Sequence, residues 1–119
     1  RLDQNAAATL VRMMESVTSD EGTAKKAQIP GYRSAGKTGT SEIISGRGGS
    51  QGVVASFVGL APAENPEIAV SVIIYQPKSG IYGGVVAGPV FSQVAAQALT
   101  LLDVPPSSTK PQLYPINAH

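Results

Sequence analysis

The segment that most constrains the fold is residues 31–40, GYRSAGKTGT, because it fits two patterns that need different structures. Read from Gly31, it matches G-x-x-x-x-G-K-T, a phosphate-binding loop that follows a buried strand and opens a helix. Read from Lys37, it gives K-T-G-T, which needs a strand at the same place. The residues on either side decide between the two interpretations.

Those flanking residues do not fit a phosphate-binding loop. Residues 22–30 (GTAKKAQIP) are polar, rich in alanine and lysine, and closed by a proline, so they do not form an apolar strand. After Lys37, β-branched residues and several glycines oppose a helix. The apolar run over residues 68–75 is followed by Gln76, where a nucleotide-binding protein would carry an aspartate for Mg²⁺. The strand interpretation is favoured, and a nucleotide binder is the remote alternative.

Composition excludes further classes of protein. The chain has 119 residues, of which 42% are hydrophobic and 14% charged, as expected of a globular interior. Its net charge of +1 and few aromatic residues give no basis for binding nucleic acid. Cysteine is absent, and the single histidine, His119, ends the chain, where we expect a frayed terminus. We therefore expect neither a metal site nor a Ser-His-Asp triad.

Hydrophobic periodicity predicts an α+β fold, a three-layer α-β-α arrangement with an antiparallel sheet. Because the second and third strands are apolar on both faces, we expect helices on both sides of the sheet. Residues 1–104 are predicted to form an incomplete domain, and residues 105–119 a tail rich in proline and serine. The expected elements are a helix over 4–17 capped by Asp3, a short helix over 23–28, and strands over 32–44, 53–61 and 67–75. The last expected element is an amphipathic helix from Pro89 to before Pro105, which is too polar to span a membrane.

Four segments in a fixed order carry a family resemblance: residues 22–24 (GTA), 35–40 (AGKTGT), 55–62 (ASFVGLAP) and 82–91 (YGGVVAGPVF). Together they resemble the C-terminal end of a class B penicillin-binding protein transpeptidase domain, closest to the septal, cell-division type. The family's fold is the penicillin-binding, β-lactamase-like fold. The resemblance covers nearly all of residues 4–103.

The resemblance implies a serine D,D-transpeptidase that works without a cofactor. Such enzymes attack the D-Ala-D-Ala bond of a peptidoglycan stem peptide, form an acyl-enzyme and pass the acyl group to an amine of a neighbouring strand. β-Lactam antibiotics acylate the same serine. The resemblance also implies residence on the outer face of the bacterial cytoplasmic membrane, an N-terminal anchor that is not in this chain, and partnership with a septal glycan polymerase and other division proteins.

By the same resemblance, the catalytic residues are Lys37 and Thr40, and the substrate-binding residues are Thr38, Gly39 and Thr40. The Lys37 ammonium would favour anionic groups and hold a hydroxyl, and the Thr40 backbone N–H would be one oxyanion-hole donor. The Thr38 and Thr40 hydroxyls, about 7 Å apart on one side of a strand, would hold the substrate or drug carboxylate. Gly39 would let the scissile amide approach. The ordinary alternatives are a solvated lysine, β-branched strand residues and a β-bulge at Gly39.

Two of the family's three signatures are not recognisable in these residues. S-x-x-K occurs at residues 34–37 and 107–110, but the first match lies in a predicted strand, where its ends would be roughly 10 Å apart, and the second in the tail, where we expect no fixed geometry. S-x-N does not occur. We therefore expect a C-terminal fragment whose companion chain carries both motifs. A β-lactamase or a β-lactam sensor is the alternative, and a structural module without chemistry is a third.

Overall fold

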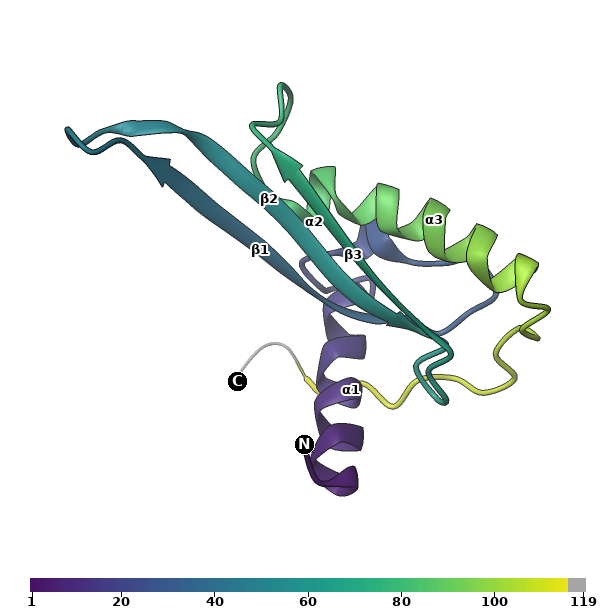
Figure 1. Cartoon of the computed structure of the whole chain (residues 1–119). Helices are drawn as coiled ribbons and strands as arrows, with labels where there is room; N and C mark the ends of the chain where they lie inside the picture. The colour runs from purple at the N-terminus through teal and green to yellow at the C-terminus, as the bar shows by residue number, and fades with distance from the viewer. Residues whose placement is uncertain (116–119) are drawn as a thin grey trace.

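The computed structural model describes residues 1–115, so His119 and its expected frayed end lie outside the described residues. Its elements follow the predicted order, with one additional short helix (Figure 1). They are α1 (Gln4–Thr18), the 3₁₀ turn η1 (Lys25–Ala27), β1 (Ala35–Ile44), β2 (Ser50–Ala61), β3 (Ile68–Tyr75), α2 (Gly83–Val86) and α3 (Gly88–Leu101).

Helix α1 begins where the sequence predicts. The Asp3 carboxylate accepts a hydrogen bond of 3.0 Å from the backbone N–H of Ala6, which satisfies one of the free donors of the first turn. At the other end, the Ser19 hydroxyl donates to the backbone oxygen of Ser16 at 2.7 Å. The predicted cap is therefore confirmed.

Strand β1 begins three residues later than predicted because a turn occupies the residues before it. The Tyr32 N–H donates to the Ile29 oxygen at 3.0 Å, and Gly31 has a φ of 82°. Proline followed by glycine at positive φ is the signature of a type II turn. At the far end, the β1–β2 ladder continues to Ile44 opposite Ser50, so β2 begins three residues earlier than the predicted strand over 53–61.

The three strands form one antiparallel sheet in the order β1-β2-β3. Its register places Phe57 of β2 between Thr38 of β1 and Val72 of β3. Because β3 pairs with β2 only as far as Tyr75 opposite Val54, the β1–β2 hairpin projects beyond the third strand (Figure 1). Strand β1 is an edge strand of the described sheet, so one side of its backbone lies outside the ladder.

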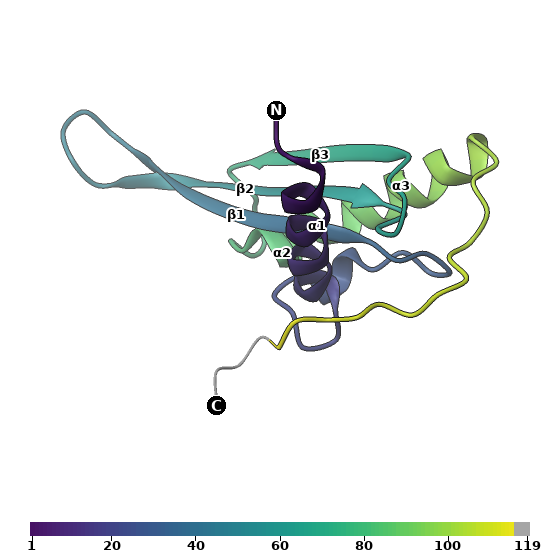
Figure 2. The ribbon, with the colours of Figure 1, turned by 90° about the horizontal axis from the view of Figure 1, so that it is seen from below.

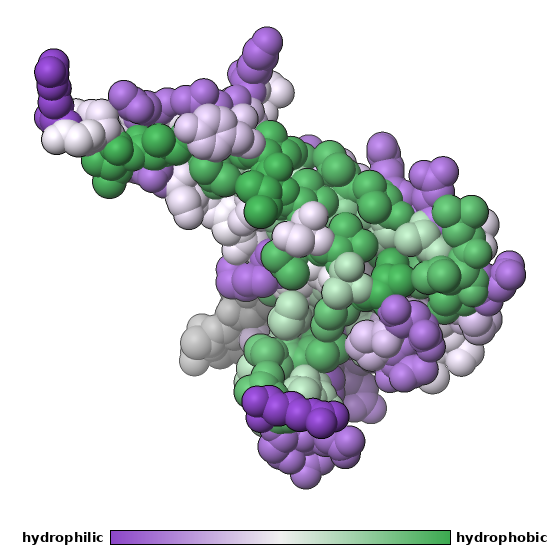
Figure 3. All heavy atoms as spheres, viewed as in Figure 1, coloured by the Kyte–Doolittle hydropathy of each residue, from purple (hydrophilic) through white to green (hydrophobic). Residues whose placement is uncertain are grey.

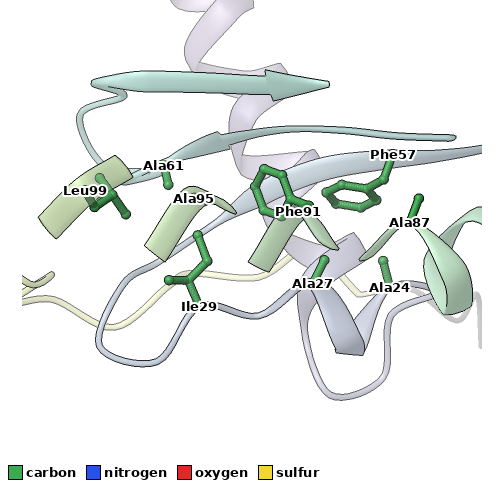
Figure 4. Close-up of a cluster of buried hydrophobic side chains, with 9 residues drawn as sticks. All are labelled: Ala24, Ala27, Ile29, Phe57, Ala61, Ala87, Phe91, Ala95 and Leu99. Carbon is green, nitrogen blue, oxygen red and sulfur yellow. The ribbon is translucent and has the colours of Figure 1, made fainter. Parts of the chain in front are cut away.

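The core lies between the sheet and helix α3 (Figure 4). Phe57 and Phe91 are fully buried, with ring centroids 4.8 Å apart at an interplanar angle of 55°. Strand glycines provide the space for these rings: a methyl group on Gly36 would overlap the Phe57 ring, and one on Gly59 would overlap the Phe91 ring. These two glycines therefore have a packing role. The other members of the core are Ala24, Ala27, Ile29, Ala61, Ala87, Ala95 and Leu99.

The second face of the sheet is largely uncovered in the described residues. Val58, Ile73 and Tyr75 share this face and are 46%, 70% and 65% exposed. Helix α1 packs mainly on β1 and leaves them open. The predicted antiparallel sheet packed with helices is thus confirmed, with α3 on one face, and in the described residues this part of the other face stays open. Hydrophobic residues form a continuous band over the strands and α3 (Figure 3).

Beyond α3 the chain returns toward α1 without regular secondary structure (Figures 1 and 2). The segment is nevertheless attached: the Ser107 N–H donates to the Gly31 oxygen at 2.9 Å, and the Tyr114 N–H donates to the Ser16 hydroxyl at 3.0 Å. The expectation of no fixed geometry at residues 107–110 is wrong, because these side chains bind the body of the molecule.

Candidate active site

The K-T-G-T residues lie in the middle of β1, on the outer edge of the described sheet. The phosphate-binding interpretation is wrong: a strand continues to Ile44 where that loop needs a helix, and η1 with a turn precedes it where a strand is needed. Lys37 and Thr40 are exposed, whereas Thr38 and Gly39 are half-buried. An exposed edge carrying one ammonium and two hydroxyls can pair with an extended, anionic ligand.

Strand alternation divides these side chains between the two faces. Thr38 and Thr40 lie opposite Phe57 and Ala55, on the face that packs on α2 and α3. Lys37 lies opposite Val58, on the largely uncovered face. The two hydroxyls are therefore on one side of β1, and the lysine stem leaves from the other.

The Lys37 ammonium nevertheless lies close to Thr38. Its Nζ donates a hydrogen bond of 2.9 Å to the Thr38 backbone oxygen and lies 3.5 Å from the Thr38 hydroxyl. The lysine side chain thus lies along its own strand, toward the next residue. The positive charge and the Thr38 hydroxyl can therefore act on the same bound group.

Gly83, at the first turn of α2, contacts this segment and was missed as a site residue by sequence reasoning. Its backbone N–H donates to the Thr40 hydroxyl oxygen at 3.3 Å. A Cβ at this position would collide with the backbone oxygens of Ser56 and Gly39, and one on the neighbouring Gly84 would collide with the Thr23 oxygen. The available signal was the glycine pair between a strand and a proline-started helix, where close backbone approach calls for glycine.

Gly39 has a packing reason to lack a side chain. A Cβ there would collide with the Ser56 hydroxyl of the neighbouring strand. The register is continuous through Gly39, and the irregularity of the β1–β2 ladder falls between Glu42 and Ile44. The alternative of a β-bulge at Gly39 is therefore wrong.

Neither S-x-x-K match has the helical geometry of a nucleophile motif. Ser34 is only 5% exposed and lies just before β1, so Lys37 follows it along an extended chain. Ser107 lies in the irregular segment after α3, where its hydroxyl accepts a hydrogen bond of 2.9 Å from the Arg33 N–H. Ser34 is buried and Ser107 is bound to Arg33, and neither serine hydroxyl is hydrogen-bonded to the lysine of its own match.

A groove of about 660 Å³ lies away from this edge, between the end of α1, residues 28–34 and the tail. Its lining includes Glu15 and Arg33 but none of the K-T-G-T residues. The K-T-G-T residues therefore lie on the open strand edge and not in this concavity. A strand edge that pairs with an extended ligand need not be a deep hollow.

Replacing Gly83 with alanine is expected to lower the free energy of unfolding by about 1–3 kcal/mol, the usual cost of overpacking. The added methyl must push α2 away from β1, so the Gly83–Thr40 hydrogen bond should also be lost. Urea titration measures the first effect, and the hydrogen-exchange rate of the Gly83 amide the second. Gly46→Ala is the control, because nothing lies within 4 Å of a Cβ there. Equal stability of the two variants would contradict the packing.

Comparison with known proteins places this arrangement in a family. The sequence model described as "Penicillin binding protein transpeptidase domain" matches residues 1–96. The chain is 44% identical over 101 residues to the probable peptidoglycan D,D-transpeptidase PenA of Neisseria flavescens, covering 83% of this chain and 25% of that protein. It is 39% identical over 102 residues to peptidoglycan D,D-transpeptidase FtsI of Escherichia coli K12, covering 84% of this chain and 17% of that protein.

Two solved structures of penicillin-binding proteins are similar to this chain in fold. The apo TP domain of Burkholderia pseudomallei penicillin-binding protein 3 superposes with a TM-score of 0.79 at 44% identity, over 88% of this chain and 32% of that one. Penicillin-binding protein 3 of Mycobacterium tuberculosis, complexed with ampicillin, gives 0.78 at 26% identity, over 92% of this chain and 27% of that one. The chain spans between 17% and 25% of the length of the two sequence relatives named above. The chain therefore belongs to the penicillin-binding protein transpeptidase domain family.

Proposed function

We propose that this chain supplies the substrate-binding edge strand of a serine D,D-transpeptidase that crosslinks peptidoglycan stem peptides. The observation that carries the proposal is the position of the K-T-G-T residues on the open edge of the sheet, with the Lys37 ammonium beside the Thr38 hydroxyl. The relatives named as peptidoglycan D,D-transpeptidases support the reaction class.

In the proposed reaction, the hydroxyl of a serine outside these residues attacks the carbonyl carbon of the penultimate D-alanine. The bond to the terminal D-alanine breaks, the serine proton passes to the leaving amine, and an ester joins the donor peptide to the enzyme. An amine of a second stem peptide then attacks that ester, which forms the crosslink and returns the proton to the serine. No oxidant or cofactor is needed.

The residues of β1 would have separate roles in this reaction. The substrate backbone would lie along the open edge, and the Thr38 and Thr40 hydroxyls would bind its terminal carboxylate. The Thr40 N–H would be one donor to the oxyanion that forms at the attacked carbonyl. Lys37 would stabilise negative charge near the reacting serine and hold a hydroxyl of the proton-transfer path. Gly39 leaves the edge unobstructed for the scissile amide.

We further propose that the S-x-x-K and S-x-N motifs come from other sequence, on a companion chain or segment. The uncovered face with Val58, Ile73 and Tyr75 supports this, because exposed apolar area of this kind marks a surface that packs against more protein. The FtsI relationship supports a role in septal cell-wall synthesis with a glycan polymerase and division proteins. The site would then lie on the outer face of the cytoplasmic membrane, held there by a separate anchor. In residues 1–115, no helix is long and apolar enough to cross a bilayer.

β-Lactams are the proposed inhibitors, since a relative of similar fold is described in complex with ampicillin. The test is intact-mass spectrometry of a preparation that includes the companion sequence, after incubation with a penicillin. We expect one penicillin mass on the serine of a helical S-x-x-K motif, with Ser34 and Ser107 unmodified. A folded preparation that gains no mass would refute the proposal.

The alternative is a β-lactamase or a β-lactam sensor. Both would also gain the penicillin adduct, so the adduct alone does not separate them from a transpeptidase. The lifetime of the adduct separates the first: fast hydrolysis marks a lactamase, whereas a persistent ester marks a synthase or a sensor. Release of D-alanine from a stem-peptide donor then separates the synthase from the sensor.

A further inference from the structure

Arg33 lies two residues before β1 and four before Lys37, and it joins three separate parts of the chain. Its guanidinium donates to both carboxylate oxygens of Glu15 in α1, at 2.7 and 2.8 Å, and to the Thr109 hydroxyl at 2.8 Å. Its backbone N–H donates to the Ser107 hydroxyl at 2.9 Å, and its backbone oxygen accepts from Ala63 at 2.8 Å. One residue therefore fixes the start of β1 from α1, the tail and the turn after β2.

The ion pair is enclosed. Glu15 is 3% exposed and the Arg33 side chain 16%. The hydrogen bonds to Glu15 raise the pKa of Arg33 above its ordinary value, so the guanidinium stays charged throughout the usable pH range. Replacing a buried ion pair with apolar side chains is often neutral or stabilising, so such a pair is weak evidence for stability. Its bidentate geometry does, however, define how two segments are oriented.

A second set of contacts holds the same place. The Thr18 hydroxyl donates to the Ser34 oxygen at 2.7 Å, which joins the last turn of α1 to the residue just before β1. The Tyr32 hydroxyl donates to the Val104 oxygen at 2.6 Å. The Ser16 hydroxyl and the Tyr114 backbone form a reciprocal pair at 3.0 and 3.1 Å. Residues 104–115, which we call the strap, are therefore bound at both ends and in the middle. Figure 2 shows this segment running from the end of α3 back past α1.

This attachment matters because of where β1 lies. In the described sheet β1 has a ladder with β2 on one side only, so its position depends on that ladder and on how its start is held. A displacement of about 1 Å in a positioning element can cost roughly 10²-fold in rate. The contacts of Arg33 act four residues before the lysine whose placement the site needs.

We propose that Arg33 is a positioning residue for the K-T-G-T segment, and that the strap holds Arg33 in place through Ser107 and Thr109. Arg33 does not reach the K-T-G-T side chains, and its action is on the strand that carries them. The expected effect of Arg33 on the acylation rate rests on the proposed function. Its expected effect on the position of β1 rests only on the contacts above.

The test compares three variants of the protein with its companion sequence present. Arg33→Lys keeps the charge but loses the two-pronged geometry. Thr109→Val removes one strap contact and is mild enough to fold if Arg33→Lys does not. Asp20→Asn is the control, because it breaks an ion pair with Lys25 at 3.3 Å whose side chains are 76% and 63% exposed. Each is measured by hydrogen exchange of the amides of residues 35–40, by the rate of penicillin acylation and by Tm.

We expect Arg33→Lys to speed amide exchange in residues 35–40 and to slow acylation by roughly tenfold or more, at temperatures far below its Tm. Thr109→Val should change both in the same direction to a smaller extent, and Asp20→Asn should change neither. A lowered Tm with unchanged exchange and acylation would overturn the proposal, since Arg33 would then be a stabilising residue only. An effect of Arg33→Lys without any effect of Thr109→Val would overturn the part assigned to the strap.

Failure of the proposed function gives a different result. In that case the folded wild-type protein is not acylated, and the exchange rates of residues 35–40 alone decide whether Arg33 positions the strand. Faster exchange in Arg33→Lys would then support the inference, and unchanged exchange would refute it.

Discussion

Replacing Lys37 with methionine is expected to slow acylation by a penicillin by roughly 10²–10³-fold, the size of effect seen when one preorganised electrostatic group is removed from such a site. Methionine keeps most of the stem but removes the ammonium, which lies 2.9 Å from the Thr38 oxygen and 3.5 Å from its hydroxyl. Stopped-flow or mass-based measurement of the second-order acylation rate gives the result, again with the companion sequence present.

Folding should be nearly unaffected by this change. Lys37 is exposed and its hydrogen bond is to the backbone of the next residue at the surface, and substitutions at such exposed positions are usually within about 0.5 kcal/mol of neutral. Lys26→Met, at an exposed lysine in η1, is the matched control and should leave the acylation rate unchanged. If Lys37→Met were acylated as fast as the control, Lys37 would be an ordinary solvated lysine, and the role assigned to K-T-G-T would lose its main residue.

Replacing Phe91 with alanine is expected to lower the free energy of unfolding by about 3–5 kcal/mol, the usual cost of deleting a buried aromatic ring. Phe91 is fully buried, packs on Phe57 with centroids 4.8 Å apart, and fills the space above Gly59. Because the glycine has no side chain to move into the gap, the cavity should close poorly. Equilibrium urea unfolding is the measurement.

A loss of that size is comparable to the whole stability of a marginal domain, so a second variant is needed. Phe91→Leu retains part of the apolar volume and should lose clearly less than Phe91→Ala. Gln97→Ala, at an exposed position of the same helix, should stay within about 0.5 kcal/mol of the parent. Equal losses for Phe91→Ala and Gln97→Ala would show that α3 does not pack on the sheet as described.

Residues that specify local structure were readable without any tertiary information. Asp3 predicted the start of α1, and the apolar runs over residues 53–61 and 67–75 predicted the second and third strands. Each signal depends on a residue's own backbone preference or on a hydrogen bond to a near neighbour in sequence. The same holds for rejecting the phosphate-binding loop, because the missing helix after Lys37 is a local property.

The roles of residues that act through contacts distant in sequence could not be recognised from the sequence. Gly36, Gly59 and Gly83 show in the sequence as glycines in or beside strands, and only the packed structure shows which ring or backbone atom takes the place of each side chain. In the sequence, Arg33 was recognisable only as one basic residue within a motif. Its partners Glu15 and Thr109 lie 18 and 76 residues away. No periodicity links such positions, because the contacts arise when separate elements pack together.

The sequence by itself therefore determined the order of the elements, the strand that carries Lys37, Thr38, Gly39 and Thr40, and the resemblance that the family comparison bears out. Only the tertiary structure decided that this strand lies at the edge of the described sheet, that Gly83 touches Thr40, and that the tail returns to hold Arg33. The physical reason is range: backbone preference and alternation act over a few residues, whereas an edge, a close backbone approach and an enclosed ion pair depend on how the elements are placed in space.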